Sequence, residues 1–79
     1  VPSPVSNSTK ISFEIPRKGH VTILIIYKEG RLIDIPVNQT LNGGTHTILW
    51  ESNPYQSGIY IYRMLFGNSV ASEKMIVVH

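Results

Sequence analysis

The sequence predicts an all-β protein, an immunoglobulin-like β-sandwich of about seven antiparallel strands. Helix signals are almost absent, because β-branched and aromatic residues dominate and alanine occurs once, at Ala71. Short apolar or alternating segments are separated by turn signals at intervals of about 8–12 residues, which is typical of this fold. Tyr60, two positions after Gly58, also has the spacing of the tyrosine corner found in such sandwiches. At 79 residues the chain is expected to form one domain.

The chain is expected to begin with an extended segment that leads into the first strand. Residues 1–8 are rich in Pro, Ser and Asn, which predicts a linker, and residues 9–79 are expected to form the folded domain. Because the chain starts at Val1 without an initiator methionine, we expect it to be part of a longer protein. Residues 10–15 alternate with period two, and this pattern directs three apolar side chains inward. They are Ile11, Phe13 and Ile15.

The remaining strands are predicted from apolar runs between turns. Both faces of residues 21–28 are apolar, which predicts a central strand that is covered on both sides. After a turn at Glu29 and Gly30, residues 31–35 form a strand that Pro36 closes, and residues 37–41 form a short edge strand. Three further strands are expected, at residues 45–51, 59–66 and 70–78.

Gly58 and Tyr60 are expected to shape the entry into the strand at residues 59–66. Gly58 lets the chain turn sharply between the sheets, and Tyr60 begins the strand with its ring inward. The tyrosine hydroxyl can then bond to a backbone group a few residues upstream. This interpretation gives the tyrosine a structural role rather than a ligand-stacking role, because buried tyrosines with a bonded hydroxyl are common in sandwiches.

The composition excludes several kinds of protein. There is no cysteine, so disulfides and thiolate metal sites are excluded. The net charge is +2 and the seven Lys and Arg residues are scattered, so nucleic acid is not expected as a partner. The longest apolar run, Val21–Tyr27, is strand-sized and shorter than the ~18 residues of a membrane-spanning helix. Charged residues make up only 15%, which suggests a surface that is uncharged and polar or that is covered by another body.

The sequence predicts neither a metal site nor a hydrolytic triad. The three histidines, His20, His46 and His79, do not have the spacing of metal ligands. A triad would need a nucleophile together with His20 or His46 and Asp34, the only aspartate. Most of the serines lie in linkers and turns, and none has a Gly-x-Ser-x-Gly context. We therefore expect no enzymatic activity and no cofactor.

The last predicted strand is apolar on both faces near its end. Alternation places Met75 and Val77 on one face, and Lys74, Ile76 and Val78 on the other. An apolar strand with few charges to protect it can pair with the sheet edge of another protein, including a second copy of the chain. Alternatively, the strand lies in the middle of a sheet or packs on a preceding domain.

Several short motifs occur in an order that resembles a known family. They are Pro2-Ser3-Pro4, Thr9-Lys10-Ile11-Ser12-Phe13, Pro16–Val21, Gly30-Arg31, Gly44-Thr45-His46-Thr47 followed by Trp50, Ser57-Gly58-Ile59-Tyr60 with Tyr62-Arg63, and Lys74–Val78. Through these motifs, nearly the whole chain resembles the C-terminal sorting domains of proteins exported by the type IX secretion system of Bacteroidota.

The resemblance implies a non-enzymatic secretion signal at the C-terminus of a larger cargo protein. The signal would direct the cargo through the periplasm and across the outer membrane to the cell surface or the medium. Its expected partners are the outer-membrane type IX translocon, a sortase-like peptidase and the upstream cargo domain. In many relatives the peptidase cuts at or before the N-terminal linker, here near or upstream of Val1, and joins the cargo to an anionic lipopolysaccharide. Other relatives keep the domain.

The resemblance also suggests which residues carry the recognition. The translocon is expected to read the terminal strand at Lys74, Met75, Ile76, Val77 and Val78. Gly30 and Arg31 form a second expected patch, while Gly58 and Tyr60 are expected to provide the shape.

Two other functions fit the pattern. The immunoglobulin-like domain of the flagellar hook-capping protein is similar in pattern, and there the sandwich acts as a structural spacer or interaction module. Carbohydrate binding is a further hypothesis, which requires an exposed planar cluster of aromatic rings such as Trp50, Tyr27 and Tyr55.

Overall fold

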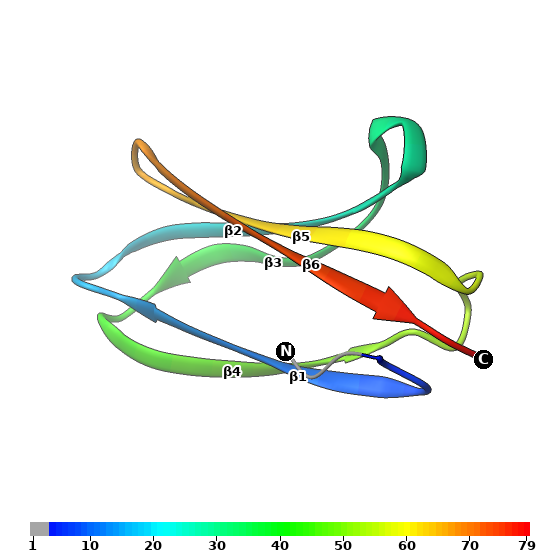
Figure 1. Ribbon diagram of the computed structural model, residues 1–79. Coiled ribbons are helices and arrows are strands. Elements are labelled where there is room, and N and C mark those ends of the chain that lie inside the picture. Colours follow the sequence, from blue (N-terminus) through cyan, green and yellow to red (C-terminus); the bar gives the residue numbers. More distant parts are fainter. Residues whose placement is uncertain (1–3) are drawn as a thin grey trace.

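The computed structural model describes residues 4–79 and confirms the predicted sandwich of antiparallel strands. Two sheets face each other as separate layers (Figure 1), one of four strands in the order β3-β2-β5-β6 and one of two strands, β1-β4. The elements within the described residues are β1 (Ser8–Ile15), β2 (Gly19–Tyr27), the 3₁₀ turn η1 (Lys28–Gly30), β3 (Arg31–Leu41), β4 (Gly44–Glu51), β5 (Gly58–Phe66) and β6 (Ser69–Val77). No helix within residues 4–79 has the length and apolar character needed to cross a membrane.

The prediction of two strands in residues 31–41 is wrong, because β3 continues through Pro36. Asp34 pairs with Ile25 and Val37 pairs with Ile23, so Ile35 and Pro36 together lie opposite a single residue of β2. Such a bulge leaves residues outside the hydrogen-bond ladder. Because β3 is also an edge strand, no second neighbouring strand needs the N–H that proline lacks. The described chain therefore has six strands.

β2 is central, as its apolar sequence predicts, but it is covered on one face only. Its inward-facing side chains lie between the two sheets and are buried. They are Val21, Ile23, Ile25 and Tyr27. The opposite face, with Thr22, Leu24 and Ile26, is only half-buried. The expectation of two covered faces is wrong because no third layer packs on the four-stranded sheet within residues 4–79.

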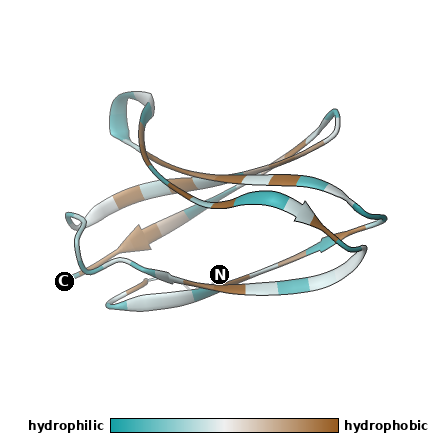
Figure 2. Cartoon of the chain, turned by 180° about the vertical axis from the view of Figure 1, so that it is seen from behind, coloured by the Kyte–Doolittle hydropathy of each residue, from teal (hydrophilic) through white to brown (hydrophobic). Residues whose placement is uncertain are grey.

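The core between the sheets consists of two clusters that lie toward opposite ends of the strands. Figure 2 shows apolar and polar residues alternating along the strands. Each strand therefore directs one apolar face toward the interior of the sandwich. One cluster is aliphatic around Phe66, and the other is aromatic around Trp50 and Tyr60. Each fully buried large side chain contributes about 1.5–3 kcal/mol through removal of apolar surface from water. The chain has no disulfide, so this burial must hold the fold together.

The segment before β1 takes part in the fold. Val5 is 2% exposed and belongs to the aromatic cluster, together with Met75 and Val77. Its backbone also forms a parallel bridge with Val77. Residues 1–3 of the predicted linker lie outside the described residues.

Candidate functional site

The predicted recognition strand lies at an edge of the four-stranded sheet. β6 pairs with β5 on one side, in a register that places Tyr60 opposite Met75 and Ile59 opposite Ile76. Alternation divides its apolar end between two environments. Met75 and Val77 are buried in the core, whereas Ile76 is 41% exposed and Val78 is 48% exposed. The strand end is therefore anchored by one set of side chains and displays the other set to the surroundings.

Gly30 and Arg31 lie at the turn between β2 and β3. The turn requires left-handed backbone at Glu29 (φ 62°) and Gly30 (φ 71°), which glycine adopts without steric cost and glutamate tolerates less well. Beyond the turn, the Arg31 guanidinium lies 5.3 Å from the centroid of the Tyr27 ring. The Lys28 ammonium lies 5.5 Å from the same centroid. Two cations thus lie beside one aromatic ring, and the ring quadrupole attracts both of them.

Gly58 and Tyr60 form the entry into β5 and pack against the Tyr27 ring. The Tyr60 hydroxyl donates a hydrogen bond of 2.5 Å to the backbone oxygen of Gln56. Burial raises the pKa of Tyr60, since a tyrosinate would lose hydration in this position. Gly58 has φ 156°, and a Cβ atom there would lie 2.9 Å from Cε1 of Tyr27. Only glycine allows this close approach of the backbone to the ring.

The structure brings these separately predicted groups to one end of the sandwich. Tyr27 and Tyr60 stack with ring centroids 4.6 Å apart, and Gly58 pairs with Val77. We call this end the tail end and define it as residues 27–31, 58–60 and 74–78. The turn that holds Arg31 and the displayed end of β6 are therefore linked through two rings and one strand pairing. No spacing in the sequence indicates this proximity.

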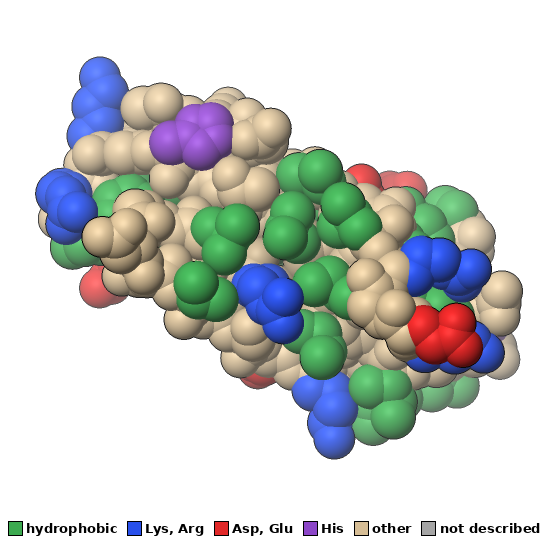
Figure 3. Space-filling view, turned by 90° about the horizontal axis from the view of Figure 1, so that it is seen from above, with side chains coloured by type: hydrophobic (Ala, Val, Ile, Leu, Met, Phe, Trp, Pro, Cys, Tyr) green, Lys and Arg blue, Asp and Glu red, His purple; other side chains and the backbone are tan. Residues whose placement is uncertain are grey.

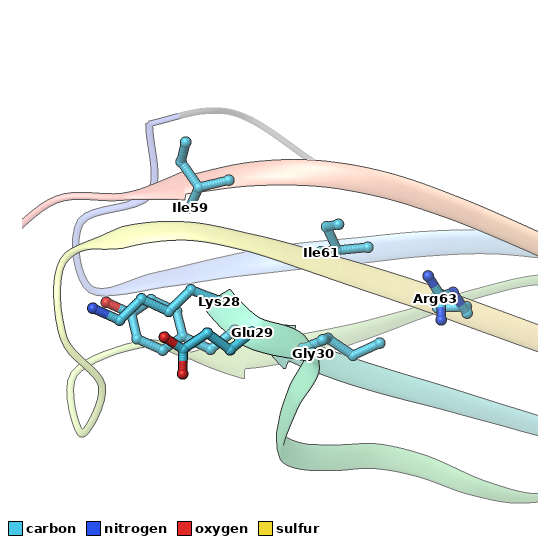
Figure 4. Close-up of a pocket in the computed structure, with 8 residues that line it drawn as sticks. Lys28, Glu29, Gly30, Ile59, Ile61 and Arg63 are labelled. Atoms are coloured by element: carbon cyan, nitrogen blue, oxygen red, sulfur yellow. The ribbon is translucent and has the colours of Figure 1, made fainter.

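A hollow of about 410 Å³ lies at the tail end on the outer face of the four-stranded sheet. Figure 4 shows the turn of Lys28, Glu29 and Gly30 beside Ile59 and Ile61 of β5, with Arg63 farther along the strand. The floor is apolar, because Ile26 pairs with Ile61 and both side chains point outward. The charged groups lie at its margins.

The apolar floor extends across the outer face of the sheet. Figure 3 shows hydrophobic side chains gathered on this face with Lys and Arg side chains among them. Ile59 lies opposite Ile76, so the floor is continuous with the displayed end of β6. The isoleucines of β5 were not among the predicted recognition residues. Both faces of β5 are apolar in the sequence, as are both faces of the last strand near its end, and this pattern could have indicated them.

A comparison with known families assigns the chain to a family. The family described as secretion system C-terminal sorting domain matches residues 1–78 of the chain. The chain belongs to this family. Neither a curated protein nor a solved structure matches the chain. The sorting domain is a signal of the type IX secretion system, whose cargo is exported to the cell surface or the extracellular space. As part of such a cargo, the sorting domain interacts with the type IX secretion machinery.

The aromatic rings of the sorting domain do not form an exposed platform for a carbohydrate. Trp50 is 3% exposed, and its Nε1 donates a hydrogen bond of 2.9 Å to Oδ2 of Asp34. Tyr55 stacks on Trp50 with centroids 5.5 Å apart, and Tyr27 is buried. The requirement of an exposed planar cluster is not met, since these rings form the aromatic half of the core.

His20, His46 and Asp34 of the sorting domain are engaged in separate local contacts. His20 Nε2 lies 2.6 Å from Oδ1 of Asn38, and His46 Nε2 lies 2.6 Å from the backbone oxygen of Asn42. Asp34 bonds to Trp50 and to the backbone N–H of Ile35. Within residues 4–79, no group of three or more His, Asp or Glu side chains is placed to hold a metal ion.

Proposed function

We propose that this sorting domain is a non-enzymatic address whose tail end is read by the outer-membrane translocon. The observation that carries the proposal is that Met75 and Val77 of β6 are buried, whereas Ile76 and Val78, the residue after the strand, are exposed. A folded domain can present such a strand without unfolding, because the core holds one face while the other face remains accessible. Exposed apolar patches of this kind are typical of protein interaction sites.

Lys74, Gly30 and Arg31 complete the proposed recognition surface. Lys74 is exposed and pairs with Ile61, so it projects from the apolar floor of the outer face. Arg31 is exposed beside the turn at Gly30. Cations around an apolar patch fix the orientation of a partner and accelerate its encounter, while the apolar area supplies affinity.

We also propose that a sortase-like peptidase acts upstream of Val5 after passage through the periplasm and the outer membrane. Val5 is buried and bonded to β6, so a cut upstream of it leaves the sandwich intact. The released cargo would then be joined to the cell surface. A cut downstream of Val5 would remove a core side chain together with its two backbone hydrogen bonds.

A secretion assay with matched variants tests the recognition surface. A reporter protein is fused upstream of the chain in a host that has the type IX system, and export is measured in the medium and on the cell surface. The double variant Ile76→Ser, Val78→Ser should keep its fold and lose most export. Val70→Ser is the control, because Val70 is 62% exposed on the same strand at its far end.

Two results would contradict the proposal. Normal export of the folded double variant would remove the recognition role from the end of β6. Retention of the wild-type fusion in the cell would favour a structural spacer instead. Arg31→Ala should give a smaller loss of export than the double variant, since a charge at the margin contributes less than the apolar contact.

A further inference from the structure

The two sheets are open along the side where β1 and β6 lie. Both strands lie on the same side of the sandwich in Figure 1, with β3 and β4 on the other side. A hollow of about 170 Å³ opens between β1 and β6. Its floor is formed by Ile23, Tyr62 and Met64, and its walls are residues 12–14 of β1 and residues 71–73 of β6. We call this hollow, together with the outer edge of β6, the β1–β6 groove.

The edge of β6 presents backbone groups toward this groove. The backbone oxygen of Ile76 accepts a hydrogen bond of 2.7 Å from Val5, and the N–H of Val78 donates one of 2.8 Å to Val5. Even-numbered residues of β6 therefore turn their peptide groups away from β5. The two-residue repeat of a strand gives Val70, Ser72 and Lys74 the same direction. Within residues 4–79, no strand pairs with this part of the edge.

Val5 shows how a strand can occupy the edge of β6. The bridge between Val5 and Val77 is parallel, and the Val5 side chain points into the core, where it is 2% exposed. A strand beside Val70, Ser72 and Lys74 in the same direction would turn alternate side chains into the hollow. The hollow is small and has an apolar floor, so it fits small or aliphatic side chains.

The charge around the groove indicates a further feature of its ligand. Glu14 of β1 and Glu73 of β6 both line the hollow. Glu73 also accepts a hydrogen bond from the hydroxyl group of Tyr62. Among the described residues, no Lys, Arg or His side chain lines the hollow. A basic side chain on an incoming strand would therefore meet two carboxylates inside the hollow, while the Arg63 guanidinium at its margin is bonded to Ser72.

We propose that the β1–β6 groove binds an extended strand of the export machinery that runs parallel to β6 and carries a basic side chain between small or aliphatic ones. The identity of the partner rests on the proposed function, whereas the chemistry of the strand rests on the groove alone. Strand addition of this kind obtains affinity from backbone hydrogen bonds and specificity from alternate side chains.

Binding of a defined peptide to the 79-residue chain tests the groove without an export assay. The probe is a short synthetic peptide of alternating threonine and valine with one central lysine, and its twin carries glutamate in place of the lysine. Binding is followed by NMR shifts and by amide exchange. The lysine peptide should shift and protect β6 residues 70–74 and shift β1 residues 12–14. The glutamate peptide should bind at least about two- to fivefold more weakly, because it loses one partly screened charge pair and brings a like charge toward Glu14 and Glu73.

Variants of the groove complete the test. Ser72→Pro removes an N–H that points away from β5, so β6 should keep its pairing and the peptide should bind about tenfold more weakly. Ser72→Ala is the matched control, because it loses only the 3.1 Å hydrogen bond from Arg63 Nε and should bind normally. Glu14→Lys has no backbone effect and leaves one carboxylate, Glu73, opposite the new cation, so it should remove most of the preference for the lysine peptide.

The outcomes separate this inference from the proposed function. Three results would each overturn the proposal that the groove binds a strand. They are equal binding of both peptides, binding that Ser72→Pro leaves unchanged, and NMR shifts confined to the outer face of the sheet. Concentration-dependent self-association through residues 70–74 would overturn it too, since a second copy would then be the occupant. Export failure of the wild-type fusion leaves the peptide result unaffected and contradicts only the proposed function.

Discussion

The hydroxyl group of Tyr60 bonds to the backbone oxygen of Gln56 and joins the start of β5 to the loop that precedes it. The same ring stacks on Tyr27 and lies opposite Met75 in the sheet. One side chain thus connects the loop, the β2–β3 turn and the displayed strand. Its removal should therefore affect the stability of the whole tail end.

Tyr60→Phe should lower the free energy of unfolding by about 1–2 kcal/mol, because the variant keeps the ring and leaves a carbonyl oxygen without its donor. Urea denaturation followed by tryptophan fluorescence measures the change. Tyr62→Phe is the control, since its hydroxyl bonds to Glu73 at an exposed site and its loss should cost less. Equal losses in the two variants would show that the bond to Gln56 has no special weight.

Gly58→Ala should destabilise the domain by about 1–3 kcal/mol. The added Cβ would lie 2.9 Å from the Tyr27 ring, and φ 156° is unfavourable for any residue with a side chain. Gly30→Ala separates the two effects, because Gly30 also has positive φ but no atom lies within 4 Å of the added Cβ. Thermal melts of both variants should show the larger loss at Gly58. The reverse order would mean that contact with Tyr27 is relieved at no cost.

Met75→Ala and Ile76→Ala should differ sharply although the residues are neighbours. Met75 is fully buried, so its truncation leaves a cavity and should cost about 2–5 kcal/mol. Ile76 is 41% exposed, and its truncation should stay within about 1 kcal/mol. Chemical denaturation gives both values. Similar losses would indicate that the outer face of β6 is also packed in the isolated chain.

Alkaline pH should destabilise the domain. Burial raises the pKa of Tyr55, Tyr60 and Tyr62, and the bond to Glu73 raises the pKa of Tyr62 further. The folded state therefore retains protons that the unfolded state loses above the ordinary tyrosine pKa of about 10. The stabilisation is complete below that pH and is lost as the pH rises through the raised folded values.

Melting temperatures recorded from neutral pH to beyond pH ~10 check this expectation. The melting temperature should fall with rising pH on the alkaline side, and tyrosinate absorbance should appear together with unfolding. Tyr62→Phe should reduce the slope. A slope that is unchanged in this variant would assign the effect to other groups.

Much of the fold follows from local patterns. Alternation in residues 10–15 correctly indicates which side chains of β1 face the core, because a strand directs successive side chains to opposite faces whatever its neighbours are. The prediction that a strand ends at Pro36 is wrong, although proline ordinarily ends a strand. Whether a proline is tolerated depends on the partner strand, and here a bulge against β2 accommodates it.

By itself, the sequence determined the all-β class, most of the strand positions, the family and the division of Met75 and Ile76 onto different faces. These properties depend on periodicity and turn chemistry, which are local. Only the tertiary structure decided that Arg31, Tyr27, Tyr60 and the end of β6 meet at one end, and that the groove between β1 and β6 stays open. Both depend on the order of strands in the sheets, which is set by long-range pairing that no local pattern records.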